Sequence, residues 1–157
     1  MWIFLISCYA LMGITTILLL MTGYAGVTHQ PIFGINHPRI ATVTMIILSF
    51  AETLIMYFFI ATSKAYRPLI SHLDNAQSFQ ISMAKIKGPI YKHVSLTILI
   101  FGIIFILGGA ADNGFSIGWL HGQLFLVGIV YYFYALKIKN TAFKDQISLI
   151  NEMDDTL

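Results

Sequence analysis

The chain has 157 residues, of which 57% are hydrophobic and only 10% are charged. A soluble domain carries about 25% charged residues, so this composition excludes an ordinary soluble globular domain. The net charge of +2 at pH 7 does not indicate a nucleic-acid partner, because the basic residues serve here as signals of membrane topology.

Apolar runs dominate the chain, and each is close to the length that a membrane-spanning helix needs. A helix that crosses a hydrocarbon core of ~30 Å takes about 20 residues. Backbone groups in lipid must satisfy their own hydrogen bonds, so such runs should be helices. We therefore predict an all-α fold: an integral membrane four-helix bundle, formed by residues 1–157 as a single membrane domain. The four predicted helices cover about 2–24, 40–62, 95–111 and 118–136.

The first run lacks the basic segment that precedes the apolar part of a cleaved signal peptide, so we expect a retained helix. Its Cys8 is the only cysteine, which excludes an intramolecular disulfide. A small buried hydrophobic side chain is the role that we expect for it.

The basic residues predict the orientation of the bundle. Arg39 alone lies on one side of the predicted helices. The other eight lie on the opposite side, and they are Lys64, Arg67, Lys85, Lys87, Lys92, Lys137, Lys139 and Lys144. By the positive-inside rule, both termini are cytoplasmic, together with the 65–93 loop and the 137–157 tail. Segments 25–38 and 112–117 then face outward, and the expected location is a bacterial inner (cytoplasmic) membrane.

The cytoplasmic loop is long for a structureless connection. Residues 75–87 lack Gly and Pro, and the apolar residues Phe79, Met83 and Ile86 are spaced near helical periodicity. This pattern predicts either an extension of the second helix or a short helix on the surface, which Gly88-Pro89 should end. The tail is expected to extend the fourth helix and to finish in acidic, solvated residues.

Two histidines lie at the outer ends of different helices. His37 precedes Pro38, a residue well suited to the first turn of a helix. His121 falls in the first turn of the fourth helix, which also begins on the outer side. His29 and Asp112 share that side, so four potential ligands should gather on one rim.

Three interpretations of this rim remain open. Two neutral imidazoles from facing helices are a usual way to hold a low-spin haem, here haem b on His37 and His121. A copper or zinc site formed by His29, His37, Asp112 and His121 is also chemically reasonable. Alternatively the rim holds no cofactor, and the histidines only place their polar tips among the headgroups.

Glu52 lies near the middle of the second helix, where a carboxylate against hydrocarbon costs several kcal/mol. Because no basic residue falls within a predicted helix, we expect Glu52 to be protonated or hydrogen-bonded to Ser49, Thr53 or a Tyr hydroxyl. We also expect it to face the bundle interior or a protein partner rather than lipid. It returns nearly to the helical face of His37. This layout suits a proton path or a quinone site, or else a hydrogen bond that locks two helices together.

Small and aromatic residues line the same region. On the fourth helix, His121, Phe125, Gly128 and Tyr132 are spaced as a stripe along one face. The Gly108–Asp112 stretch, GGAAD, falls at the depth of His121. Small residues allow close approach, either of a flat macrocycle or of a neighbouring helix.

The segment SIGWLHGQLFLVGIVYYFYALKIKN resembles the WLH-bearing helix of the HemJ family, membrane protoporphyrinogen oxidases that hold haem b. The likeness covers about a quarter of the chain and implies His121, together with His37, as haem ligands. Two features depart from that family: Gln123 stands near the place of its lysine, and the earlier histidine opens the second helix rather than the first. The enzyme activity is not implied.

These observations predict a small membrane protein that binds haem b, or another metal, near its outer face. Its expected role is electron transfer linked to a quinone or to other subunits of a redox complex, with Glu52 handling protons. The competing class is a non-catalytic accessory subunit that pads or anchors a larger membrane assembly. A haem protein should turn both histidines inward, whereas an accessory subunit should present Glu52 or its small-residue face outward.

Overall fold

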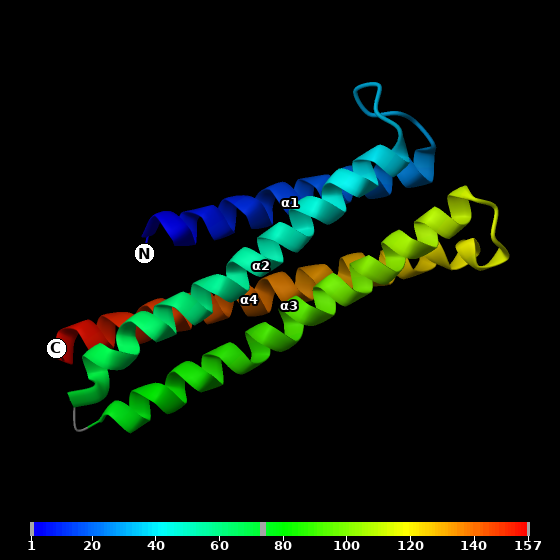
Figure 1. The fold of residues 1–157 in the computed structure, drawn as a ribbon. Coiled ribbons are helices and arrows are strands. Elements are labelled where there is room, and N and C mark those ends of the chain that lie inside the picture. Colours follow the sequence, from blue (N-terminus) through cyan, green and yellow to red (C-terminus); the bar gives the residue numbers. More distant parts are fainter. Residues whose placement is uncertain (1, 73–74, 157) are drawn as a thin grey trace.

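The computed structural model describes residues 2–72 and 75–156, and four long α-helices make up most of them (Figure 1). Short 3-10 turns, η1 (Ile70–His72) and η2 (Ser116–Trp119), precede the third and fourth helices. The helices are α1 (Trp2–Thr28), α2 (His37–Leu69), α3 (Ala76–Asp112) and α4 (Leu120–Thr156). The predicted all-α class is confirmed, and each helix is long and apolar enough to cross a membrane.

The connections between helices divide the bundle into two ends. Residues 29–36 and 113–115 join the helices at one end, which we call the histidine end because α2 and α4 start there with His37 and Leu120-His121. Both chain termini and the connection between α2 and α3 lie at the opposite end, which we call the terminal end (Figure 1).

Three of the helices are longer than a bilayer requires. At 1.5 Å per residue, the 33 residues of α2 and the 37 residues of each of α3 and α4 span roughly 50–55 Å. The 65–93 segment is largely helical. The predicted extension of the second helix reaches Leu69, and the helical spacing at residues 75–87 belongs to α3, which begins at Ala76, rather than to a separate surface helix. The Gly88-Pro89 pair does not end a helix, because α3 runs through Pro89.

Packing explains why α3 continues through a proline. Phe79 and Met83 are buried against Leu149 and Ile150 of α4. Each such side chain contributes about 1.5–3 kcal/mol on full burial, and two of them together match the ~3 kcal/mol that an interior proline costs. At the terminal end, α3 and α4 therefore pack together with the end of α2 and with η1. Residues of the predicted 137–157 tail, such as Leu149 and Ile150, form part of this core.

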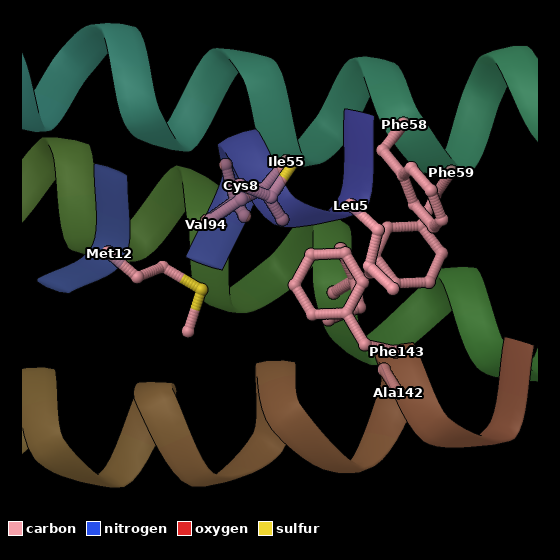
Figure 2. Packing of buried hydrophobic residues seen from close by; sticks show 10 residues of the cluster. Leu5, Cys8, Met12, Ile55, Phe58, Phe59, Val94, Ala142 and Phe143 are labelled. Carbon is pink, nitrogen blue, oxygen red and sulfur yellow. The ribbon is translucent and has the colours of Figure 1, made fainter. Parts of the chain in front are cut away.

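The middle of the bundle is filled by aromatic and aliphatic side chains. Phe58 and Phe59 of α2 pack around Phe143 of α4, with ring centroids 5.2 Å apart in each case. Leu5 and Cys8 of α1 complete this cluster (Figure 2). Cys8 is fully buried and has no disulfide partner, which confirms the role predicted for it.

The helices associate as two hairpins. α1 packs chiefly against α2, and α3 packs chiefly against α4. Extensive packing of α2 against α3 joins the two hairpins, whereas α1 and α4 touch only sparsely. Both hairpins contribute to a third cluster near the histidine end, formed by Leu19, Leu48, Phe101, Ile104 and Tyr132. Between this cluster and the histidine end, the side chains do not fill the bundle completely, and His37 and His121 lie beside the hollows that remain.

Candidate functional site

His37 and His121 converge between the two hairpins. Their ring centroids are 5.8 Å apart, and the ring planes are inclined by 68°. Two nitrogens that ligate one metal ion lie about 4 Å apart, because each metal–nitrogen bond measures about 2.0–2.1 Å. Each ring nitrogen lies roughly 1 Å from its ring centroid, so two imidazoles that each direct one nitrogen at a shared ion have centroids roughly 6 Å apart. The two rings therefore lie next to each other, a point that the sequence left open.

Each imidazole is held by a main-chain carbonyl of the preceding helix. His37 Nδ1 lies 3.1 Å from the Thr22 carbonyl oxygen, and His121 Nδ1 lies 2.9 Å from that of Ile104. A carbonyl can only accept, so Nδ1 of each ring carries the proton and donates it. The tautomer is thereby fixed with a lone pair on Nε2, which is the arrangement that orients metal-ligating histidines.

The groups that accept from these Nδ1 atoms belong neither to a loop nor to the nearby Asp112. Both acceptors lie inside helices, at Thr22 of α1 and Ile104 of α3. A carbonyl in a helix is already the acceptor of one intrahelical bond, but its second lone pair can accept another donor that approaches closely enough.

Glycines provide that close approach. A Cβ at Gly26 would lie 3.0 Å from His37 Cε1, and a Cβ at Gly108 would lie 2.9 Å from His121 Cε1. In each case the glycine stands four residues after the residue whose carbonyl accepts the histidine. Each ring therefore contacts the helix backbone at a glycine, and a side chain in place of Gly26 or Gly108 would displace the ring.

The two halves of the site are built alike, although the sequences of the two hairpins do not otherwise resemble each other. In both hairpins the first helix offers a carbonyl and, four residues later, a glycine, and the second helix starts with the histidine that uses them. In each hairpin, only one glycine and one histidine are the same in both halves. Two shared residues are too few to be recognised as a repeat when the two halves of the sequence are compared.

Hollows adjoin the histidine pair. One, of about 260 Å³, is lined mainly by apolar side chains of α2 and α3, including Met45, Phe101 and Phe105. The other, of about 690 Å³, lies between α1 and α4 and is lined by glycines together with Phe125 and polar residues of the 29–36 connection. His37 and His121 line both hollows, so a flat group held between the rings could extend to either side.

The remaining candidates on this rim do not complete a set of metal ligands. His29 and Asp112 line the larger hollow together with the histidine pair. Yet among residues 2–72 and 75–156, no three His, Cys, Asp or Glu side chains come close enough to hold one metal ion. Among the described residues, the four-ligand copper or zinc site is thus not assembled, and the two histidines form a pair without a third such side chain.

The other two histidines lie away from this pair. His72 is exposed in η1 at the terminal end. His93, expected in or near the loop, lies within α3 and bonds through Nδ1 to the Tyr131 hydroxyl at 2.7 Å. Both are therefore suitable controls for experiments on the pair.

Glu52 forms a buried ion pair with Lys139 of α4. The carboxylate is 2% exposed and the lysine is 0% exposed, so Glu52 faces the interior as predicted. The expectation that no basic residue reaches it is wrong, because Lys139, in the predicted helical extension of the fourth helix, lies on the buried face of α4. Lys139 is seven residues after Tyr132, so the predicted stripe on this helix could have revealed it.

A tyrosine and two threonines extend this polar layer to α1. The Tyr132 ring centroid lies 5.5 Å from Lys139 Nζ, within the range of a cation–π interaction. The Tyr132 hydroxyl bonds to the Met12 carbonyl oxygen at 3.3 Å and lies 3.4 Å from Thr16 Oγ1. Among the described residues, Glu52 Oε2 and Thr15 Oγ1 are buried without a hydrogen-bond partner. One carboxylate oxygen thus remains available to a proton or to a polar group.

The small residues serve helix contacts as well as the histidine site. The notch at Gly128 is filled by the Ile104 side chain of α3, whose Cδ1 lies 2.7 Å from the position of an added Cβ. Gly118 lies against the backbone of Ala111. Only Gly108, in the GGAAD stretch, is directly opposed to a histidine ring.

Comparison with known proteins adds no family to this description. No protein-family model, no curated protein and no solved structure matches the chain.

Proposed function

We propose that the chain is an integral membrane protein that holds haem b, or another metal centre, between His37 and His121. The observation that carries this proposal is the convergence of two imidazoles whose Nδ1 atoms both donate to main-chain carbonyls. Interfacial histidines that merely reach for headgroup water have no reason to turn toward one another between the helices.

Haem b fits the surroundings better than a small ion does. Two neutral imidazoles are a complete set of axial ligands for a low-spin haem. A structural zinc ion needs four ligands, and no third His, Cys, Asp or Glu joins the pair in the described part of the chain. The apolar hollow between α2 and α3 would receive one side of the macrocycle. The larger hollow, with its polar rim, would receive the other side.

When bound, such a group supplies one-electron oxidation and reduction, so the proposed role is electron transfer in a membrane, linked to a quinone or to a redox complex. His37 and His121 would hold the iron through Nε2. Gly26 and Gly108 set the ring positions. The Glu52–Lys139 pair would balance charge and handle protons deeper in the bundle, since ionisable residues in such positions commonly serve proton relays.

The absorption spectrum of the purified protein tests this proposal. We expect a Soret band that shifts on reduction with dithionite and is lost in both His37→Ala and His121→Ala, because each substitution removes one axial ligand. His72→Ala and His93→Ala should keep the wild-type spectrum. If the wild-type protein shows no such band, even after incubation with haemin, the accessory-subunit interpretation becomes the better one.

The membrane orientation forms part of the proposal, with the terminal end in the cytoplasm. Lys64, Arg67, Lys85, Lys87, Lys92 and Lys144 all lie in the half of their helix that is nearer the terminal end, and Lys137 lies at the middle of α4. This bias agrees with the positive-inside rule. In a Cys8→Ala background, we expect Ile32→Cys to react with an impermeant thiol reagent in intact cells. Gln77→Cys should react only after permeabilisation. The reverse pattern of labelling would invert the orientation.

A further inference from the structure

A basic cleft lies between α2 and α3 toward the terminal end, far from the histidine pair. Its volume is about 350 Å³. Its lining residues follow one stripe on each helix, at positions 60, 63, 64 and 67 and at positions 80, 83, 87 and 91. This spacing places all of them on facing sides of the two helices.

Three positive charges line this cleft without any acidic residue to neutralise them. They are Lys64 and Arg67 of α2 and Lys87 of α3. Among the described residues the only ion pair joins Glu52 to Lys139, so the three charges lack a partner within the part of the chain that the structure shows. A second hollow, on the α4 side of α3, contains Lys85 and Lys137 but also Asp145.

Neutral donors and an apolar floor complete the cleft. The side chains of Gln80 and Tyr91 line it and make no hydrogen bond to other described residues. Ile60 and Met83 provide apolar surface beside them. Cations and neutral donors above an apolar floor match a phosphate group attached to acyl chains. Arginine in particular can bind phosphate oxygens in a bidentate manner.

The depth of the cleft agrees with this ligand. Counted along α2 from His37, residues 60–67 lie roughly 35–45 Å from the histidine end. Along α3, Tyr91 lies roughly 30 Å from Asp112 by the same count. A hydrocarbon core is about 30 Å thick, and the whole bilayer with headgroups is about 40–45 Å thick. A membrane that begins at the histidine end therefore has its second headgroup layer at this cleft, where tyrosine is also favoured.

We propose that this cleft binds the phosphate of an anionic phospholipid in the leaflet at the terminal end. Basic pockets between membrane helices on the cytoplasmic side are suited to such headgroups. The proposal rests on the membrane placement proposed above but not on a cofactor at the histidine pair. Its test is therefore independent of any haem spectrum.

The test compares two triple variants of the full-length protein in a non-ionic detergent, with lipid retention measured by native mass spectrometry. Lys64→Gln/Arg67→Gln/Lys87→Gln removes the charges of the cleft. Lys85→Gln/Lys137→Gln/Lys144→Gln removes the same net charge from basic residues outside it. Each variant is incubated with phosphatidylglycerol or with phosphatidylcholine of identical acyl chains.

We expect the wild-type protein to retain phosphatidylglycerol in preference to phosphatidylcholine. The cleft variant should lose at least ~10-fold in affinity for the anionic lipid, because each basic residue near an anionic surface contributes measurably, and the control variant should resemble the wild type. Equal losses in both variants, or no loss in either, would overturn the proposal.

Two further measurements separate the remaining outcomes. If an excess of inorganic phosphate displaces phosphatidylglycerol completely, the cleft binds a soluble anion and the lipid proposal fails. If the cleft triple variant does not fold, Arg67→Lys and Arg67→Gln are compared instead. We then expect Arg67→Lys to retain more lipid than Arg67→Gln, and equal retention by the two would contradict a role for Arg67.

Discussion

Replacing Lys139 with methionine is expected to destabilise the protein by about 3–5 kcal/mol, because the substitution leaves the Glu52 carboxylate buried without a counter-charge. Glu52 is 2% exposed and Lys139 is 0% exposed, so water cannot take over the role of the missing partner. Glu52→Leu should lower the free energy of unfolding by a similar amount, since it leaves the Lys139 ammonium buried without a counter-charge. Reversible unfolding of the purified protein by an anionic detergent in mixed micelles measures both free energies.

The double variant Glu52→Leu/Lys139→Met should recover most of this loss. Replacing both members of a buried ion pair by apolar side chains of similar size is often neutral or stabilising. Lys137→Met, an exposed position two residues away, serves as the control and should change stability by less than about 0.5 kcal/mol. If Lys139→Met behaves like Lys137→Met, the ion pair does not contribute to the fold.

The same variants bear on function. A double variant that is stable but has lost proton-linked redox activity would separate the role of the pair in chemistry from its role in packing. Glu52→Gln offers a milder version, because its amide keeps a hydrogen-bonding side chain in the polar layer while removing the negative charge.

The length and composition of the apolar runs were sufficient to predict four helices. Because consecutive helices of a bundle run in opposite directions, this prediction also implied that His37 and His121 start at the same end. The local signals at the two helix starts, Pro38 and the Trp119-Leu120-His121 segment, placed both histidines within a turn of that end. The sequence thus placed both histidines at one end, but whether their rings turn toward each other or toward the headgroups was left open until the structure showed them 5.8 Å apart.

The Glu52–Lys139 pair could not be found in that way. A lysine just beyond an apolar run is ordinarily an interfacial residue and a topology signal, and Lys139 was counted as one. Hydropathy treats each residue separately, whereas this pair depends on two charges that offset each other's cost of burial. The available signal was the helical spacing of Tyr132, Ala135 and Lys139, all of which are buried on α4.

The 65–93 segment was misread for a related reason. Gly88-Pro89 is a strong local signal for a helix end, but local propensity is overridden when a helix buries an apolar stripe. The spacing of Phe79 and Met83 already indicated that stripe. Its partners, Leu149 and Ile150, lie some 70 residues away in the chain, so nothing nearby in the sequence showed that it would be buried.

Gly108→Ala should disturb the histidine site, whereas Gly109→Ala, one residue further on, should not. A Cβ at Gly108 would lie 2.9 Å from His121 Cε1, while a Cβ at Gly109 has nothing within 4 Å. The same contrast exists on α1, where Gly26 is opposed by the His37 ring at 3.0 Å and Gly13 is open. In both controls alanine should stabilise the helix by about 0.5–1 kcal/mol, because glycine is the poorer helix former.

At Gly26 and Gly108 this gain should be outweighed. The ring must move away from the added methyl group, which lengthens or breaks the bond from Nδ1 to the carbonyl and releases the tautomer that this bond selects. Nitrogen-15 spectra of the histidine side chains should therefore show a single tautomer in the wild type and in both controls. They should show a mixture at His37 in Gly26→Ala and at His121 in Gly108→Ala.

This spectrum requires no bound cofactor, so it tests the geometry even if no metal is ever found. If haem is bound, the same two variants should weaken its retention by roughly 10–100-fold, the usual cost of removing the group that orients a ligating histidine. The controls should retain haem fully. Wild-type tautomers in Gly26→Ala and Gly108→Ala would mean that the rings tolerate the methyl group. The glycines would then serve only the packing of α1 against α2 and of α3 against α4.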